Sequence, residues 1–214
     1  HHAIVEHING AQSKITDMTY DALNRMTSWS DGTVNESYVN RGIEAVRTSK
    51  TNNGVMTNYL YDTKVIRGMP KGNRVIGEYQ SGNAIRTYTS GTYLDEVLSM
   101  YPIGSKTVYY SANGLLSVSA LTDSTGTVVE RNKYEAFGKI TFLDPDGLTI
   151  RTQSQYGNTK AFDGRTQDKT GLIDFRWRTN DPNLGIFRER DPKGYKNQSD
   201  NNLYEFVGNN PVLN

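Results

Sequence analysis

Short strand-like segments separated by turn residues recur along this chain of 214 residues, and this pattern restricts the fold more than any other feature. Residues 74–79 end at a turn around Gly82, and residues 84–88 end at a turn around Gly91. Strands at intervals of roughly 8 to 12 residues are typical of an all-β sandwich, barrel or repeat sheet. The 14 Tyr and 20 Gly residues agree, because Tyr suits a pleated surface and Gly supplies turns. The sequence therefore predicts an all-β fold.

Further strands are predicted in the middle of the chain. Asn113-Gly114 is a strong signal for a two-residue hairpin loop that closes the strand at 106–110. Residues 116–120 alternate between apolar and polar side chains, and another strand is expected to open at Val128, carry Tyr134 and end at Phe137-Gly138. The weak helical spacing at 93–100 indicates a loop with one turn.

The composition excludes several kinds of site. The chain has no Cys, and its three histidines are His1, His2 and His7. A disulfide framework, a thiolate nucleophile and a Cys/His zinc site are therefore excluded, and a Ser-His-Asp triad would need a histidine from the terminal segment. We expect no metal and no cofactor, and any chemistry must use carboxylates, hydroxyls, Lys or Arg.

The charge and hydropathy patterns exclude two kinds of partner. A total of 24 Lys and Arg against 23 Asp and Glu gives a net charge of +1, which argues against a nucleic-acid interface. No apolar run approaches the length of about 18 residues that a membrane span needs. No signal peptide is visible at the N-terminus.

Two segments share the same order of a turn, a Thr-rich strand and a Tyr-Asp dipeptide. The first contains Tyr20-Asp21 and the second contains Tyr61-Asp62. A Tyr-Asp pair at a strand end lets the ring cover the neighbouring strand while the carboxylate makes contacts with the turn or with solvent. The dipeptide alone is not specific, but its surroundings are.

Residues 20–27, Tyr-Asp-Ala-Leu-Asn-Arg-Met-Thr, resemble the YD repeat of bacterial Rhs (rearrangement hotspot) proteins. Residues 119–138 resemble the start of the Rhs-repeat-associated core. The remaining motifs of that core follow in order: Phe162-Asp-Gly-Arg165, Thr170-Gly-Leu172, Arg176-Trp-Arg178, Asp181-Pro182, Leu184-Gly185, Phe187, Arg190-Asp-Pro192, Asn202-Leu-Tyr204 and Asn209-Asn-Pro211. The resemblance extends to Tc-toxin C subunits, wall-associated YD proteins and, more distantly, teneurins.

The resemblance implies an all-β fold in which a YD-repeat sheet spirals into a shell or cocoon, with an Rhs-core plug at its C-terminal end. Residues 1–118 are then YD-repeat strands of the shell, and residues 119–214 are the core. Stacked repeats bury a shared face that no single repeat can bury alone. In toxin-bearing relatives the shell encloses a downstream effector, and the core cuts it loose. The implied partners are this toxin effector, the remaining shell segments of the same polypeptide and the secretion machinery of a secreted or surface-delivered bacterial protein.

The candidate catalytic residues are Asp191, in an Asp-Pro-x-Gly motif, and Arg178, thirteen residues earlier. The resemblance assigns Asp191 as one of two carboxylates of an aspartyl-protease-like site, with Arg178 also implicated. Such a pair shares a proton, so that one carboxylate activates water while the other protonates the carbonyl oxygen. The alternative is that Asp-Pro-x-Gly simply forms a turn.

The second carboxylate is where the sequence departs from the family pattern. Relatives continue past Asn209-Asn-Pro211 to another Asp-Pro-x-Gly, and this sequence ends at Asn214, just short of that position. We expect at most an incomplete, single-turnover self-cleaving core. The alternative function is a surface YD-repeat module for adhesion or carbohydrate binding, without catalysis.

Three other motifs are interpreted as turns or loops. Residues 144–147, Asp-Pro-Asp-Gly, form a loop turn, with Asp144 and Asp146 as a less favoured calcium site that lacks further oxygen ligands. Residues 181–185 form another turn. Residues 68–74 are basic and Gly-rich, but they lack the Gly-Lys-Ser/Thr ending of a phosphate loop and favour a hairpin loop.

Overall fold

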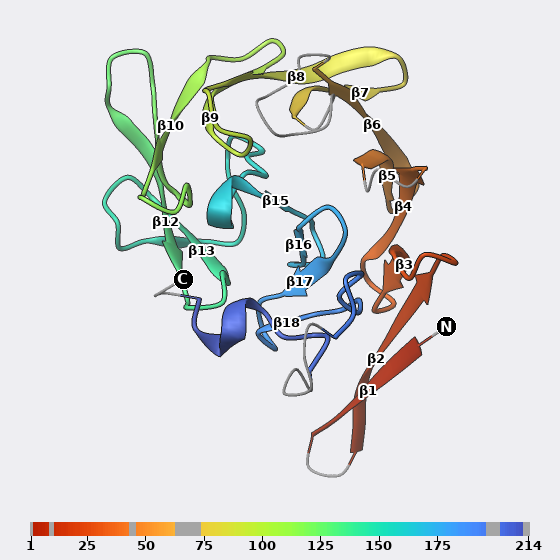
Figure 1. The fold of residues 1–214 in the computed structure, drawn as a ribbon. Helices are drawn as coiled ribbons and strands as arrows, with labels where there is room; N and C mark the ends of the chain where they lie inside the picture. The colour runs from red at the N-terminus through yellow and green to blue at the C-terminus, as the bar shows by residue number, and fades with distance from the viewer. Residues whose placement is uncertain (1, 9–10, 43–45, 63–73, 196–201, 212–214) are drawn as a thin grey trace. The chain divides into compact units, whose positions relative to one another are not determined.

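The computed structural model describes residues 2–8, 11–42, 46–62, 74–195 and 202–211. Over these residues the fold is nearly all β, which confirms the predicted fold class. The strands of the main sheet are antiparallel neighbours in chain order (Figure 1). They are β1 (His2–Ile8), β2 (Ala11–Tyr20), β3 (Met26–Ser30), β4 (Asn35–Arg41), β5 (Val46–Asn52), β6 (Val55–Tyr61), β7 (Val75–Gln80), β8 (Asn83–Ser90), β9 (Val97–Pro102), β10 (Val108–Ala112), β11 (Val118–Thr122), β12 (Val128–Tyr134), β13 (Ile140–Leu143) and β14 (Ile150–Arg151).

The C-terminal part of the chain has shorter elements. They are the 3₁₀ turns η1 (Phe162–Gly164) and η2 (Val207–Asn209) and the strands β15 (Thr166–Gln167), β16 (Ile173–Asp174), β17 (Thr179–Asp181) and β18 (Ile186–Phe187). Among the described residues, no helix is long and apolar enough to cross a membrane.

The chain divides into two compact units. The first contains His1–Thr57 and Lys169–Asn214, and the second contains Asn58–Asp168. Each unit has its own buried core. The predicted boundary between YD strands and core, at residues 118 and 119, stays a prediction.

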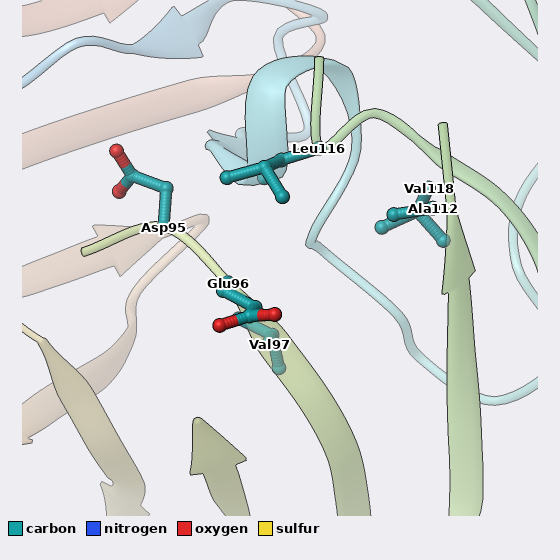
Figure 2. Close-up of a pocket in the computed structure, with 7 residues that line it drawn as sticks. Asp95, Glu96, Val97, Ala112, Leu116 and Val118 are labelled. Carbon is teal, nitrogen blue, oxygen red and sulfur yellow. The ribbon is translucent and has the colours of Figure 1, made fainter. Parts of the chain in front are cut away.

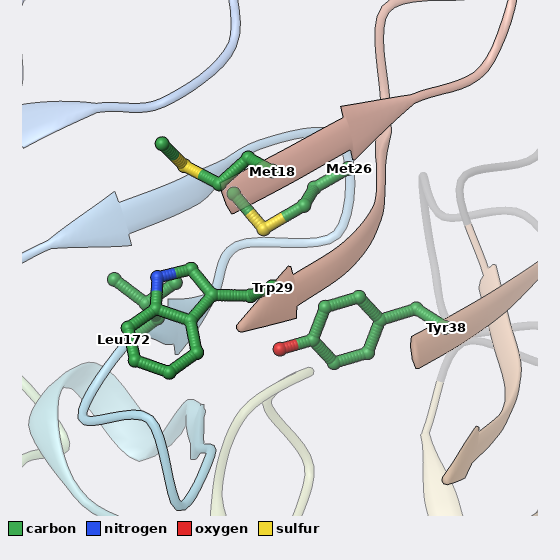
Figure 3. Close-up of a cluster of buried hydrophobic side chains, with 5 residues drawn as sticks. All are labelled: Met18, Met26, Trp29, Tyr38 and Leu172. Atoms are coloured by element: carbon green, nitrogen blue, oxygen red, sulfur yellow. The ribbon is translucent and has the colours of Figure 1, made fainter. Parts of the chain in front are cut away.

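The core of the first unit is a cluster of buried side chains from β2, β3 and β4, joined by Leu172 from the C-terminal part of the chain. Met18 and Trp29 are cross-strand partners, so their side chains lie on the same face of the sheet. Figure 3 shows Leu172 against the Trp29 indole ring, with Met26 and Tyr38 completing the cluster. Burying each of these large side chains contributes about 1.5–3 kcal/mol, so the cluster fixes the C-terminal segment onto these strands.

The second unit has an equivalent core on strands β8 to β11. Tyr88, Met100, Val108, Val118 and Leu121 are buried together. Met100 is the cross-strand partner of both Tyr88 and Val108, which places the three on one face. The strand predicted over 116–120 is confirmed from Val118 onward, where β11 begins with Val118 buried in this core, whereas Leu116 and Ser117 lie in the preceding loop.

Buried glutamates on the strands are balanced by tyrosine hydroxyls and basic side chains. Tyr38 donates to Glu36 at 3.0 Å, and Tyr88 donates to Glu78 at 2.6 Å. Arg86 lies 3.4 Å from Glu78 as an ion pair. Buried charge is costly unless it is paired and hydrogen-bonded, so these contacts allow the glutamates to lie on the buried face of the sheet.

The first Tyr-Asp motif closes its hairpin by an arrangement that we call the Asp–Arg clasp. The backbone N–H of Asp21 donates to the carbonyl of Arg25 at 2.9 Å, and the Arg25 guanidinium contacts the Asp21 carboxylate at 2.7 and 2.6 Å. Arg25 also donates to the carbonyl of Gly42. Asn24 adopts a positive φ of 59°, which suits Asn in such a turn.

The second Tyr-Asp motif repeats the clasp with a longer loop. Asp62 donates its N–H to the carbonyl of Arg74 at 3.0 Å, and the Arg74 guanidinium contacts the Asp62 carboxylate at 2.9 and 2.7 Å. Arg74 also donates to the carbonyl of Gly91 at 2.7 Å, 17 residues further along, as Arg25 does to Gly42. The motif similarity in the sequence therefore reflects a repeated structure. Residues 68–73 of the basic loop lie outside the described residues.

Two of the loop predictions are wrong in detail. Asn113-Gly114 does not form a two-residue hairpin, because Asn113 donates its N–H to the Ser117 carbonyl and the loop is wider. The side chain of Asn113 accepts hydrogen bonds from the backbone of Leu115 and Ser117, both at 3.0 Å, which stabilises the wider loop. Residues 93–100 contain the expected turn, but β9 begins within them at Val97.

Candidate functional site at Arg178 and Asp191

A tight hairpin in the first unit positions the two predicted site residues. Arg178 directly precedes β17, and Asp191 lies four residues after β18. The hairpin turn lies at residues 181–185, where Gly185 donates to the Asp181 carbonyl at 2.8 Å, so the turn predicted there is confirmed. The Arg188 N–H donates to the Thr179 carbonyl at 2.8 Å. This pairing brings residues around 178 and 190 close together.

Arg178 and Asp191 form an ion pair, with 3.1 Å between Nη1 and Oδ2. Each side chain is 20% exposed, so the pair is partly buried but can still be reached from solvent. The Arg178 guanidinium also stacks 3.7 Å above the Phe187 ring, which itself packs edge-on against Phe175 and Phe206. A planar guanidinium on an aromatic ring has a fixed orientation, so this packing aims it at the carboxylate.

The charge of Arg178 depends on its surroundings. Burial lowers the pKa of Arg178 below its ordinary value, while the negative charges of Asp191 and Glu189 oppose this shift. Arginine remains protonated at any physiological pH. The site therefore keeps one fixed positive charge that faces two carboxyl groups.

Asp191 also forms the turn that its motif predicts. Its Oδ1 accepts a hydrogen bond from the Lys193 N–H at 2.9 Å, and its carbonyl accepts one from Gly194 at 3.0 Å. Its own N–H donates to the Leu203 carbonyl at 2.9 Å. The turn interpretation is thus confirmed, and the ion pair exists in addition to it. A catalytic role for the pair stays a prediction.

Glu189 was not identified from the sequence, and it lies beside this pair. Its side chain is 2% exposed and accepts hydrogen bonds from the Thr179 N–H at 2.6 Å and the Thr179 hydroxyl at 3.0 Å. Burial raises the pKa of Glu189 to about 7, against the hydrogen bonds that lower it. No local signal marks this residue, because its partner Met26 lies 163 residues away in the sequence.

The loop before Arg178 is strained. Arg176 adopts a positive φ of 69°, which costs an arginine about 1 kcal/mol or more. The loop is held by hydrogen bonds from the Phe175 N–H to the Arg178 carbonyl at 2.8 Å and from the Arg176 N–H to Asp174 Oδ1 at 2.7 Å. These contacts fix the backbone from which the Arg178 side chain extends.

The Asp-Pro-Asp-Gly motif at 144–147 is a turn, as predicted. Asp146 accepts hydrogen bonds from the backbone of Leu148 and Thr149 at 2.8 and 3.0 Å, and Asp144 forms an ion pair with Arg151. These contacts occupy the carboxylates that the less favoured calcium interpretation needed. Within the part of the chain that the structure describes, no group of three or more acidic or His side chains could hold a metal ion.

A small pocket in the second unit contains two further carboxylates. Figure 2 shows Asp95 and Glu96 on one side of it and apolar side chains, among them Leu116, on the other. Its volume of about 20 Å³ has room for a single water molecule. Asp95 pairs with Arg165 at 3.2 Å, and Glu96 accepts hydrogen bonds from the backbone of the preceding turn. Both carboxylates stabilise loops, so this pocket is not the candidate site.

Three curated relatives are similar in sequence, and the chain matches no family model. It is 31% identical over 172 residues to a tRNA3(Ser)-specific nuclease WapA of Bacillus spizizenii and 32% identical over 170 residues to a tRNA(Glu)-specific nuclease WapA of Bacillus subtilis subsp. natto. A tRNA nuclease WapA of Bacillus subtilis strain 168 is also 32% identical. Each match covers 78% of this chain, and the chain spans only 7% of the length of these relatives.

Solved structures of Tc toxins have a similar fold. The crystal structure of TcdB2-TccC3 matches with a TM-score of 0.65 at 19% identity, over 92% of this chain and 10% of that one. The Photorhabdus luminescens Tc holotoxin pore matches with a TM-score of 0.63 at 16% identity, over 95% of this chain and 10% of that one. At these identities the likeness concerns the fold alone. Together the comparisons support, at the level of the broad family, the relationship to Rhs and YD-repeat toxins that the motifs predict.

Proposed function

We propose that this chain forms part of the β-shell of an Rhs-type bacterial toxin, which encloses a C-terminal effector of the same polypeptide and is delivered to the cell surface or secreted. The similarity to WapA nucleases over 78% of the chain supports the toxin assignment. The antiparallel order of the strands and the likeness to TcdB2-TccC3 support a shell segment. The role in interbacterial competition follows from the same assignment.

We further propose that Arg178 and Asp191 belong to an aspartyl-protease-like site at which the polypeptide cuts itself once. The observation that carries this proposal is their ion pair of 3.1 Å, which joins two motifs of the resemblance and lies at partly exposed side chains. Asp191 would activate water or share a proton with a second carboxylate, which the family pattern supplies from a later Asp-Pro-x-Gly motif. Arg178 would stabilise the negative charge of the pair.

The test uses the complete gene product, analysed on a denaturing gel and by mass spectrometry. Two fragments are expected from the wild type, and Asp191→Asn is expected to remain intact because an amide cannot act as the base. Asp123→Asn is the matched control, since Asp123 also caps an Asp-x-x-Gly turn but lies on an exposed loop. Cleavage that persists in Asp191→Asn, or a wild type that stays intact, contradicts the protease proposal and leaves the shell proposal standing.

A binding module without catalysis is the second candidate, because two tyrosines are exposed on neighbouring strands. Tyr101 on β9 and Tyr109 on β10 are 41% and 43% exposed. The strand register places them on the same face of the sheet. Stacking against sugar rings would use such a face. A glycan array on which Tyr101→Ala and wild type bind alike contradicts this candidate.

A further inference from the structure

The carboxyl group of Glu189 connects the two segments that carry Arg178 and Asp191. It accepts two hydrogen bonds from Thr179, which follows Arg178 in the chain, and Glu189 itself lies two residues before Asp191. The Glu189 carboxyl therefore links the backbone segments that carry Arg178 and Asp191. Any change in this link alters the backbone on both sides of the pair.

The same carboxyl group reaches the first Tyr-Asp hairpin. Its Oε1 accepts a hydrogen bond of 3.1 Å from the backbone N–H of Met26, the first residue of β3. The Tyr20 hydroxyl, at the end of β2, lies 3.4 Å from the carbonyl of Arg188. One buried group thus joins the hairpin, β17 and the segment of Asp191, all within the first compact unit.

Several charged or titratable groups act on Glu189 or on its nearest charged neighbours. They are Tyr20 from β2, Asp174 from β16, Arg178 before β17, and Arg188 on its own segment, with Arg47 and Asp181 as the ion-pair partners of Asp174 and Arg188. Asp174 forms an ion pair with Arg47 at 3.3 Å, and Arg188 forms one with Asp181. The positive charge that would balance an ionised Glu189 is therefore mainly that of Arg178.

We propose that Glu189 is a positioning residue whose protonation state regulates the Arg178–Asp191 site; this inference rests on the proposed self-cleavage. A neutral Glu189 leaves the guanidinium to Asp191, and its unprotonated oxygen still accepts hydrogen bonds from the neighbouring segments. An ionised Glu189 is a second negative charge in a dry environment, and it competes with Asp191 for Arg178. The site then loses the fixed orientation that catalysis requires.

The direction of the pH dependence follows from burial. The folded-state pKa of Glu189, about 7, lies above its ordinary value of 4.5. Its contribution to stability is therefore fully present below pH 4.5 and is lost as the pH rises toward 7.

Both tryptophans of the chain, Trp29 and Trp177, belong to the first unit, so their fluorescence reports this unit alone.

The test compares the pH profile of self-cleavage in wild type and Glu189→Gln. The complete gene product is purified in urea, diluted into buffers from pH 6 to pH 8, and sampled over time on a denaturing gel. Because a group with a pKa of about 7 changes from mostly neutral to mostly ionised in this range, the wild-type rate is expected to fall about tenfold, and that of Glu189→Gln less than twofold. Glu205→Gln, which alters a carboxylate with one exposed hydrogen bond to Asn209, is expected to keep the wild-type profile.

The outcomes separate this inference from the proposed function. If Asp191→Asn is inactive but Glu189→Gln keeps the tenfold fall, the inference is wrong and the proposed function stands. If Asp191→Asn still cleaves, the proposed function is wrong. Should Glu189→Gln fail to refold, Thr179→Val replaces it, since loss of the hydroxyl donor raises the pKa of Glu189 further and must move the midpoint of the profile to higher pH. An unmoved midpoint overturns the inference.

Discussion

The Asp–Arg clasp of the first Tyr-Asp hairpin makes a quantitative prediction about stability. Asp21→Ala removes two hydrogen bonds that the carboxylate accepts from the backbone of Leu23 and Arg25, both at 2.9 Å, each worth about 0.5–1.5 kcal/mol. It also leaves the Arg25 guanidinium, whose side chain is 10% exposed, without its carboxylate. Breaking a fully buried pair costs about 3–5 kcal/mol, and the Asp21 side chain is 24% exposed, so the lower end applies. The hydrogen bonds and the broken ion pair together give an expected loss of about 4–6 kcal/mol.

The assay is urea unfolding of the chain followed by tryptophan fluorescence. Trp29 is buried in the core that this hairpin helps to form, so its emission reports the affected unit. With an m-value of about 2 kcal/mol/M, the midpoint is expected to fall by about 2–3 M urea. Asp17→Ala, on the exposed face of the adjoining strand, is the control and is expected to change the stability by less than about 0.5 kcal/mol.

A double variant separates the ion pair from the turn. Asp21→Ala combined with Arg25→Met removes both charges, so no unpaired buried charge remains and the loss is expected to be smaller than that of Asp21→Ala alone. A midpoint for Asp21→Ala equal to that of Asp17→Ala would refute the reasoning. A double variant that loses the sum of the two single losses would also refute it.

Two further predictions concern the second unit and are checked by thermal unfolding followed by circular dichroism. Gly164→Ala is expected to lower Tm by at least about 10 °C, because a Cβ there would lie 2.1 Å from the Asp95 carbonyl oxygen. Gly126 also has a positive φ but has open space around it, so Gly126→Ala is expected to lower Tm by less than half as much. Tyr88→Phe is expected to destabilise the unit by about 1.5–3 kcal/mol, since it removes the 2.6 Å hydrogen bond to the buried Glu78; a loss below 0.5 kcal/mol contradicts this.

Local chemistry made the strands and most turns predictable. Asp123 and Gly126 form a turn whose signals lie within five residues, because the Asp123 side chain accepts hydrogen bonds from residues two and four positions on. Asn113-Gly114 has the same kind of local signal, yet its loop is wider. The register of β10 and β11 shifts between Ser111 and Ala112, beside the loop, and the Asn113 side chain accepts two backbone hydrogen bonds within it.

The site itself was predictable only in part. Arg178 and Asp191 came from a resemblance, and their ion pair shows that the two motifs meet. Glu189 escaped prediction because its partner Met26 is 163 residues away, and nothing local marks a glutamate as buried. Glu36 has the same character: a charged residue on a strand is usually exposed, but Glu36 is buried and accepts hydrogen bonds from Tyr38 and Asn52.

The Asp–Arg clasp closes a loop of three residues after Asp21 and one of eleven residues after Asp62 with the same set of contacts. The hydrogen bonds that end one strand and begin the next therefore do not depend on what lies between them. A gene that encodes such repeats can exchange, lengthen or shorten these connections by recombination without disturbing the strands on either side. The clasp thus separates the part of each repeat that must stay constant for folding from the part that is free to diversify.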